Sequence, residues 1–297
     1  MKKNIAIGII GLGMWGEKYL QTLEQLNAGP IYLCDTSDQK IEDLNSRNYI
    51  TIEYSKMMES KDIKAVIITT PDQTHYALAR DALIHDKDVL VEKPMTLKSS
   101  DAHELVKIAQ NRKLVLAVAH TPLFTTGYQR LSSYLKSKLI NVIRIEAIRT
   151  SRGRENTSSP LWDLASHDIA IAVSLLGKPL YFSCSVNNPK LCRYELEFAN
   201  GLTFAGEAEW TNQPFQRVIR LFTKNEVHEY HEPIGNDIPA TELPLTQMCQ
   251  NFIEACVKRL KPVNNGELGK QVVECLEIIE NLMKINNHEI ICNNSGI

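Results

Sequence analysis

Two segments of this chain carry side chains that can transfer a proton. Lys93 stands between Glu92 and Pro94, directly after the apolar run Val89–Val91. A proline restricts the backbone of the residue before it and allows a cis peptide bond. A lysine held there could hydrogen-bond a substrate hydroxyl and take its proton. By chemistry alone, an exposed lysine at the end of a strand is usually just solvated, so this motif leaves both interpretations open.

The other segment places Asp163 four residues before His167, at the start of a predicted helix that runs to about Leu176. Residues four apart share one face of a helix. A carboxylate beside an imidazole can orient the ring and tune it for proton transfer. The alternative is a helix N-terminal charge at Asp163 and a packed ring at His167, and the pair in isolation favours that alternative.

A glycine-rich turn with the pattern GxGxxG follows the apolar run Ile5–Ile10 and opens a helical pattern. In a strand–turn–helix setting this pattern predicts a dinucleotide site. Gly11 permits the tight turn, Gly13 lets a pyrophosphate approach the backbone, and Gly16 lets the helix pack on the sheet. The N–H groups at the helix N-terminus favour phosphate. The predicted cofactor contacts of the turn are Gly11, Gly13, Met14, Trp15 and Gly16.

An acid follows at the end of the second apolar run, where Asp35 stands 24 residues after Gly11. A carboxylate at this place can accept hydrogen bonds from both ribose hydroxyls of NAD. It would repel the 2′-phosphate of NADP, so the sequence favours NAD, and NADP is the weaker candidate. The alternative is a tight turn followed by an acid that only caps a neighbouring group.

The elements that must position these residues are visible in the first 120 residues. Short apolar runs alternate with helical patterns, which predicts a parallel sheet covered on both faces. This is a doubly wound α/β domain of the Rossmann type. The predicted strands lie in Ile5–Ile10, Ile31–Cys34, Ala65–Thr69, Val89–Val91 and Leu114–Ala119, and the helices in Glu17–Asn27, Tyr76–His85 and Ser100–Asn111.

The pattern changes after about residue 120. Apolar and polar residues alternate through Arg193–Ala199 and Leu202–Trp210, and the Asn200-Gly201 pair between them is a strong hairpin signal. Two helices close the chain. We therefore predict a Rossmann domain over residues 1–120 and an α/β domain with a large, mostly antiparallel open sheet over residues 121–297.

Composition excludes several classes of protein. The 297 residues contain 33 Lys and Arg against 35 Asp and Glu, and this formal charge of −2 argues against a nucleic-acid partner. The seven cysteines are odd in number and lack CxxC or zinc-site spacing, which indicates a reduced, cytoplasmic chain without a metal site. No stretch of 18 apolar residues occurs, so no membrane-spanning helix is expected.

One ordered set of motifs runs through nearly the whole chain. It consists of the glycine turn, Asp35, Thr69-Thr70-Pro71 with His75, Glu92-Lys93-Pro94, and Asp163-x-x-x-His167. This set resembles the glucose–fructose oxidoreductase / inositol dehydrogenase / rhizopine-catabolism (Gfo/Idh/MocA) family. The resemblance implies a nicotinamide cofactor, a sugar or cyclitol substrate, and an open sheet that makes homo-oligomer contacts.

Carried over residue by residue, the resemblance makes Lys93, Asp163 and His167 the catalytic group. It implies that Thr70, Pro71 and His75 line the nicotinamide-side ribose, beside cofactor contacts from Thr69, Glu92 and Lys93. A closer likeness, to members that act on nucleotide-linked sugars in surface polysaccharide synthesis, rests on Ala119-His120-Thr121, Arg149–Arg154 and Leu161–Asp168. It implies substrate contacts from Lys93, His120, Arg152, Trp162, Asp163 and His167.

The sequence thus predicts an NAD-dependent oxidoreductase that moves hydride between a secondary alcohol of a sugar or cyclitol and nicotinamide. Which of Lys93 and His167 is the base stays open. The alternative is a non-catalytic NAD(P)-binding sensor or assembly protein on the same fold. We also expect a homodimer or homotetramer, formed through an apolar sheet face containing Phe198, Phe204 and Trp210 if the chain's own helices leave that face uncovered.

Overall fold

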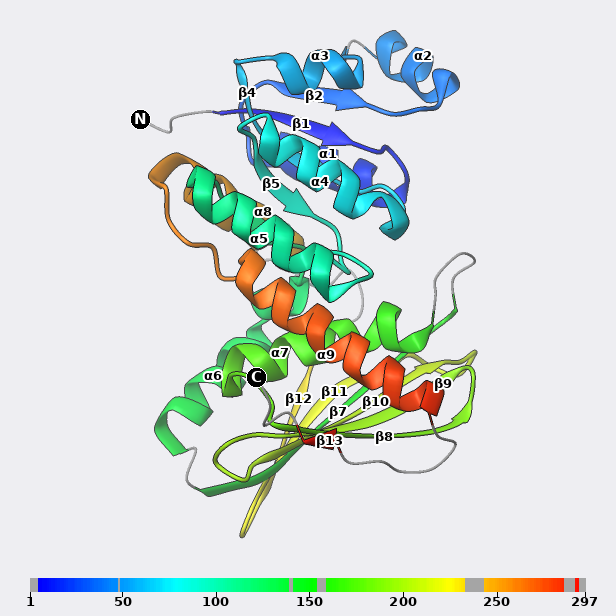
Figure 1. Ribbon diagram of the computed structural model, residues 1–297, viewed down its shortest axis with the longest axis vertical. Coiled ribbons are helices and arrows are strands. Elements are labelled where there is room, and N and C mark those ends of the chain that lie inside the picture. Colours follow the sequence, from blue (N-terminus) through cyan, green and yellow to red (C-terminus); the bar gives the residue numbers. More distant parts are fainter. Residues whose placement is uncertain are drawn as a thin grey trace. The chain divides into compact units, whose positions relative to one another are not determined.

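A computed structural model describes residues 5–47, 49–138, 141–153, 159–232, 243–285 and 292–293 of the chain. Its contacts divide the chain into two compact units, each described here by itself (Figure 1). Unit 1 contains Met1–His120 and Ala240–Lys270, and unit 2 contains Thr121–Pro239 and Gln271–Ile297. The predicted division into domains after residue 120 stays a prediction.

Unit 1 is built on a parallel sheet with the strand order β3-β2-β1-β4-β5-β6. Its central strands are almost wholly buried because apolar side chains leave both faces. Ile9, for example, pairs with Leu33 on one side and Ile67 on the other, and none of these three is more than 1% exposed. The predicted doubly wound sheet is confirmed. Its strands are β1 (Ala6–Ile10), β2 (Ile31–Cys34), β3 (Ile50–Thr51), β4 (Ile63–Ile68), β5 (Asp88–Val91) and β6 (Leu116–Val118).

Helices accompany the sheet, and each buries the apolar stripe of its sequence. Helix α1 buries Tyr19, Leu20 and Leu23, and it also contacts α8 from the C-terminal half of the chain. Figure 1 shows α8, in orange, among the blue and cyan elements of unit 1. The helices that begin in unit 1 are α1 (Met14–Gln25), α2 (Asp38–Ser46), α3 (Tyr54–Glu59), α4 (His75–Ile84), α5 (Ser99–Arg112), α8 (Pro244–Lys258) and α9 (Gly266–Ile285), with a 3₁₀ turn η1 (Asp72–Thr74) before α4.

Unit 2 contains a mixed sheet with the order β12-β11-β7-β10-β9-β8-β13, in which only the β7–β10 pair is parallel. The mostly antiparallel sheet is confirmed. Its strands are β7 (Val142–Ser151), β8 (Tyr181–Asn188), β9 (Leu191–Glu197), β10 (Thr203–Trp210), β11 (Arg217–Thr223), β12 (Val227–His231) and β13 (Cys292–Asn293). The other elements are η2 (Thr121–Phe124), α6 (Thr126–Lys138), the π-helix η4 (Leu161–Ala165), α7 (Ser166–Leu176) and the later turns of α9.

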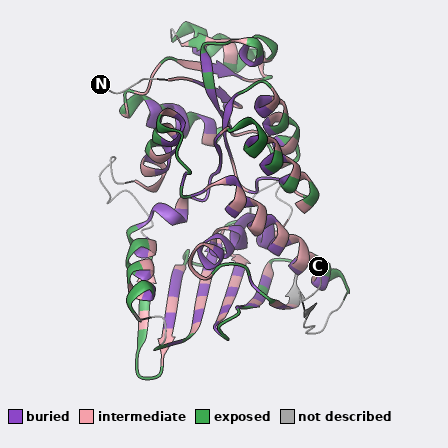
Figure 2. Cartoon of the chain, turned by 60° about the vertical axis from the view of Figure 1, so that its left-hand side comes forward, coloured by how far each residue is buried: buried purple, intermediate pink, exposed green. Residues whose placement is uncertain are grey.

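The two faces of this sheet differ in chemistry, and buried and partly exposed residues alternate along its strands (Figure 2). The apolar face lies against helices of the same unit: α7 contacts β10, and the Cys184 thiol on β8 lies 3.8 Å from a carbonyl oxygen of α9. Phe198 and Phe204 are on this face and are at most 2% exposed. The expected apolar face is therefore present, and because α7 and α9 cover it, the condition set for an association surface is not met.

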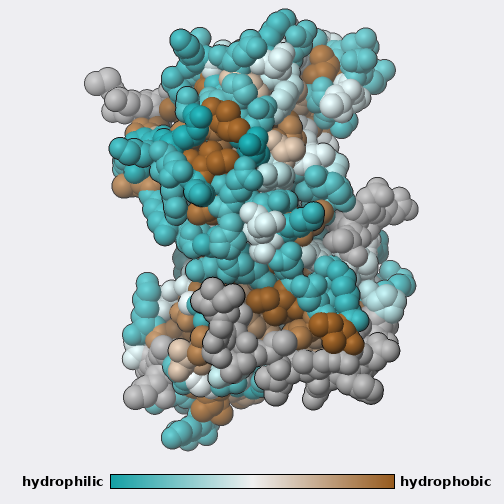
Figure 3. Space-filling view, in the orientation of Figure 1, coloured by the Kyte–Doolittle hydropathy of each residue, from teal (hydrophilic) through white to brown (hydrophobic). Residues whose placement is uncertain are grey.

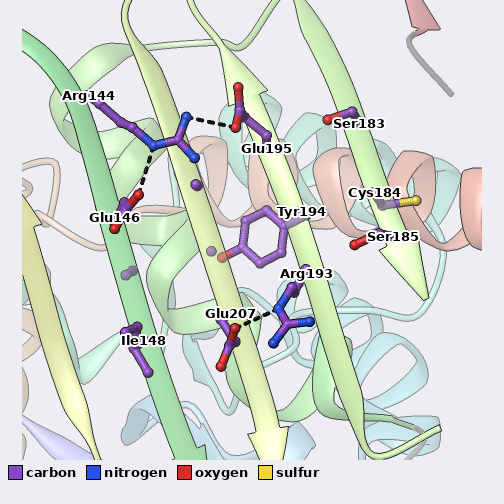
Figure 4. A pocket seen from close by; sticks show the side chains of 13 residues that line it. Arg144, Glu146, Ile148, Ser183, Cys184, Ser185, Arg193, Tyr194, Glu195 and Glu207 are labelled. Carbon is purple, nitrogen blue, oxygen red and sulfur yellow. Dashed lines mark hydrogen bonds and ion pairs between the residues drawn. The ribbon is translucent and has the colours of Figure 1, made fainter. Parts of the chain in front are cut away.

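The opposite face carries paired charges (Figure 4). Arg144 contacts Glu146 and Glu195, each at 2.9 Å, and Arg193 contacts Glu207 at 2.6 Å. These side chains surround a hollow of about 320 Å³ over the middle strands. On the side drawn in Figure 3, brown hydrophobic areas lie among hydrophilic side chains. The expected homo-oligomer stays a prediction, because the described side chains on this face are the paired charges and not an apolar patch.

The sequence predicted no membrane-spanning helix, no metal site and reduced cysteines. None of their helices is both long and apolar enough to span a membrane. No three metal-binding side chains among them gather around one point. The six cysteines whose side chains are described are free and buried.

Candidate active site

The glycine turn forms the first part of the site, between β1 and α1. Gly11 has φ = +90°, a conformation that an L-residue rarely adopts. A Cβ on Gly16 would lie 2.1 Å from the Gly11 carbonyl oxygen, whereas a Cβ on Gly13 would meet nothing within 4 Å. Gly13 is also the N-cap of α1 and provides no side-chain cap. The turn therefore leaves open space before uncapped N–H groups, which fits the pyrophosphate of a dinucleotide.

Asp35 holds this turn from the end of β2. One carboxylate oxygen accepts the Leu12 N–H at 2.6 Å, the other accepts the Ser37 N–H at 2.9 Å, and the Lys40 ammonium lies 3.5 Å away. Burial raises the pKa of Asp35, but these donors and the ammonium outweigh burial and lower it below its usual value. Asp35 is consequently ionised at neutral pH and can accept ribose hydroxyls.

Lys93 follows β5 at the carboxyl edge of the same sheet, and its peptide bond to Pro94 is cis. Glu92 beside it accepts the Tyr19 hydroxyl at 2.9 Å with one oxygen and the Lys93 N–H at 3.2 Å with the other. Burial is the main cause that raises the pKa of Glu92, while Lys93, Tyr19 and His75 act against it. Tyr19 and its bond to Glu92 had no signal in the sequence, because 73 residues separate the two partners.

The segment after β4 connects the turn to the Lys93 segment. The Thr69 hydroxyl donates to the Gly11 carbonyl at 2.5 Å, so it fixes the first glycine. Thr70 and Pro71 are partly or well exposed at the sheet edge, where a ligand can reach them. His75 is only 1% exposed, and its ring nitrogens lie 2.7 Å from the Pro94 carbonyl oxygen and 2.8 Å from the Thr70 carbonyl oxygen. Both ring nitrogens of His75 therefore contact backbone carbonyl oxygens of the protein.

His120 follows β6, the neighbour of β5. Its ring is 1% exposed, and neither ring nitrogen has a hydrogen-bond partner among the described residues. Burial, with a smaller effect of the Lys93 charge, lowers the pKa of His120 to about 3. The ring is therefore a neutral imidazole, with one donor and one acceptor available to a ligand hydroxyl.

The second part of the site lies in unit 2. Asp163 falls inside the π-helix η4, and His167 lies in the first turn of α7. The sequence predicted one regular helix here, and the wider turn is a correction; such turns are frequent at functional sites. The Asp163 side chain is buried and accepts the Trp210 indole N–H at 3.2 Å. Sequence reasoning missed this role of Trp210, which comes from β10.

Other predicted residues of unit 2 are placed differently. Trp162 is 3% exposed and donates its indole N–H to Glu280 at 3.0 Å, and Arg152 is exposed at the end of β7. Arg154, in the arginine-bearing segment, lies outside the described residues. Asp168 pairs with buried Arg149 at 2.8 Å and belongs to the core of the unit.

The structure therefore brings the predicted residues together in two groups. Around the carboxyl edge of the unit 1 sheet lie the glycine turn, Asp35, Thr69 to His75, Glu92, Lys93 and His120. Asp163 and His167 share one helical segment of unit 2. That Lys93 and the Asp163–His167 pair act on one substrate belongs to the proposal below.

Comparisons with known proteins agree with these motifs. Residues 5–120 match the model of the Gfo/Idh/MocA oxidoreductase family, described as an NAD-binding Rossmann fold. Over these residues the chain is similar to the family that its ordered motifs resemble. It is 25% identical over 203 residues to inositol 2-dehydrogenase of Burkholderia cenocepacia, which covers 64% of this chain and 60% of that protein.

A second relative is UDP-N-acetylglucosamine 3-dehydrogenase of Acidithiobacillus ferrooxidans. It is 28% identical over 180 residues, which cover 59% of this chain and 55% of the relative. The chain's matches span about half the length of its curated relatives. A solved structure of this same enzyme shares the fold with a TM-score of 0.79 at 20% identity, over 94% of this chain and 97% of the other.

Proposed function

We propose that this protein is an NAD-dependent oxidoreductase that acts on a secondary alcohol of a sugar or cyclitol. The observation that carries the proposal is Lys93, held by Glu92 at the sheet edge that also carries the glycine turn. Ligands of open α/β sheets bind along this edge. The family model that matches residues 5–120 describes NAD-binding oxidoreductases, which supports the same reaction class.

Each residue of the site has its own role in the proposed reaction. The N–H groups at the start of α1 bind the pyrophosphate, and ionised Asp35 accepts the adenosine ribose hydroxyls and selects NAD over NADP. NAD, when bound, supplies the hydride acceptor. Lys93 donates a hydrogen bond to the substrate oxygen, His167 takes the hydroxyl proton, and Asp163 orients His167 or a neighbouring sugar hydroxyl.

Two relatives support the substrate class. One is named an inositol 2-dehydrogenase and the other a UDP-N-acetylglucosamine 3-dehydrogenase, so both names describe oxidation at a ring carbon that bears a hydroxyl. For this chain we propose a nucleotide-linked sugar, as in surface polysaccharide synthesis, with a free sugar or cyclitol as the second choice. His120 and Arg152 remain the proposed substrate contacts. A homo-oligomer and a cytoplasmic location are part of the same proposal.

The test is hydride transfer from a panel of nucleotide sugars, free sugars and cyclitols to NAD and NADP. Lys93→Met removes the hydrogen-bond donor, and His167→Asn removes the proton acceptor. We expect each to lower turnover by about 10²–10⁴-fold, with the NAD dissociation constant nearly unchanged. Lys107→Met, on the exposed face of α5, is the matched control and should be fully active.

The outcomes separate the function classes. If both site variants keep near-normal turnover per folded molecule, the proposed catalytic group is wrong. If the protein binds NAD but transfers hydride to no substrate in the panel, a nucleotide-binding sensor becomes the better description. The loss of one ionisation from the pH profile in His167→Asn would assign the base to His167 rather than Lys93.

A further inference from the structure

The backbone around Lys93 is held from both sides by ionisable side chains of unit 1. On the N-terminal side, the Lys93 N–H donates to Glu92 at 3.2 Å. On the C-terminal side, the Pro94 carbonyl oxygen lies 2.7 Å from Nδ1 of His75. Nε2 of the same ring lies 2.8 Å from the carbonyl oxygen of Thr70, so His75 also joins the segments after β4 and β5.

The two hydrogen bonds of the His75 ring indicate its protonation state. A carbonyl oxygen can only accept, so each ring nitrogen must carry a proton to make its contact. A neutral imidazole has one N–H, and it would direct the lone pair of its other nitrogen at a carbonyl oxygen less than 3 Å away. Because the ring is 1% exposed, water cannot replace the lost hydrogen bond. The contacts therefore require a ring that is protonated at both nitrogens.

Glu92 holds the other side of Lys93. One of its oxygens accepts the Tyr19 hydroxyl, and the other accepts the Lys93 N–H. Burial raises the pKa of this carboxyl, while the charges of Lys93 and His75 act against burial. Because the helix dipole disfavours positive charge at the start of α4, a cation there depends on the two carbonyl oxygens that face the His75 ring.

We propose that His75 is a buried imidazolium and that it acts, together with Glu92, as a positioning clamp on the backbone of Lys93. The part of this inference that concerns turnover rests on the proposed function, because it takes Lys93 as the group that meets the substrate. In this role His75 acts through the backbone of Lys93 and not through the reacting atoms. It fixes where the Lys93 side chain starts, and displacing a catalytic group by about 1 Å can cost about 10²-fold in rate.

The charge of the ring is tested on the unmodified protein by NMR of ¹⁵N-labelled histidine at pH 7.5. The His75 signals are assigned by their loss in His75→Gln. We expect both ring nitrogens of His75 to appear protonated, and a single neutral tautomer would overturn the proposal. His85 is the internal reference, because it lies at the other end of α4 with an exposed side chain.

The positioning role is tested with His75→Gln, which retains one donor and no charge. We expect amide hydrogen exchange at Lys93 and Met95 to accelerate, and turnover to fall by about 10²-fold while the NAD dissociation constant is little changed. His85→Gln should alter neither quantity. Unchanged local exchange or normal turnover in His75→Gln would overturn the clamp. If no substrate is found for the unmodified protein, the proposed function fails, while the NMR and exchange measurements still decide the clamp.

Discussion

Asp35 orders the glycine turn through the Leu12 N–H, and in the proposed function the same carboxylate accepts the adenosine ribose hydroxyls. We predict that Asp35→Ala narrows the preference for NAD over NADP. NAD should bind more weakly without its hydroxyl acceptor, and the 2′-phosphate of NADP should no longer be repelled. The dissociation constants of both cofactors for both proteins measure this change.

Asp38→Ala, at the exposed start of α2, is the control and should leave both dissociation constants unchanged. If the unmodified protein bound NADP as tightly as NAD, the role given to Asp35 would have to be abandoned.

His120 makes stability depend on pH in a defined direction. Its pKa is about 3 in the folded chain and about 6.5 in an unfolded chain, so the unfolded state binds the extra proton between these values. Stability should therefore fall as the pH drops below about 6.5. Urea unfolding should show that the unmodified protein loses about 1.4 kcal/mol more than His120→Leu between pH 7.5 and pH 5.5. Equal losses in the two proteins would contradict the burial of a neutral ring at this position.

Sequence reasoning identified the residues that carry local signals and missed their distant partners. The glycine turn and Asp35 follow from strand–turn–helix order, which is encoded within about 30 residues. The bond from Trp210 to Asp163 joins residues 47 positions apart and has no spacing rule. The residues of a site can therefore be proposed from sequence, whereas the groups that orient them require the folded chain.

At the scale of elements, periodicity predicted the strands well and one helix start wrongly. An apolar run or an alternating pattern specifies a strand through burial alone, so the type of both sheets was predicted, although the strands β3, β8 and β13 were not. The π-helix Leu161–Ala165 differs from a regular turn by one residue per hydrogen bond, and the sequence pattern does not distinguish the two. Whether helices cover the apolar face of β10 was left open, since an alternating pattern does not identify the element that packs on a strand.

An added methyl group should have different effects at Gly16 and Gly13, two glycines of the same turn. Gly16→Ala places a Cβ 2.1 Å from the Gly11 carbonyl oxygen, so α1 must shift and the free energy of unfolding should fall by about 1–3 kcal/mol. Gly13→Ala meets no atom within 4 Å, so stability should be nearly unchanged while NAD binding weakens. Urea unfolding and NAD titration on both variants make the comparison. Normal NAD affinity in a stable Gly13→Ala protein would show that the pyrophosphate does not approach this turn.

At the scale of the whole molecule, the segment Ala240–Lys270 belongs with the first 120 residues, although more than a hundred residues separate them. Arg259 contacts the buried carboxylate of Asp88 at 2.6 Å, and Asn264 exchanges two hydrogen bonds with Val118, one through its backbone and one through its side chain. The sequence predicted two C-terminal helices but not where they pack, because the apolar stripe of a helix does not identify the element that covers it.

This arrangement predicts how the N-terminal part behaves alone. A fragment of residues 1–120 lacks α8, which packs on α1, and it lacks Arg259, the ion-pair partner of Asp88, which is 2% exposed in the whole chain and keeps the Val115 N–H as a hydrogen-bond donor. Leaving that carboxylate without Arg259 should cost about 1–3 kcal/mol, and apolar surface of α1 becomes exposed in addition. We expect this fragment to unfold at lower urea concentration than the same residues joined through a flexible Gly/Ser linker to residues 243–270. Circular dichroism and urea titration of the two fragments compare them directly. Equal unfolding midpoints would mean that the parallel sheet of unit 1 is equally stable without residues 243–270. The contacts of Arg259 and Asn264 would then contribute little to its stability.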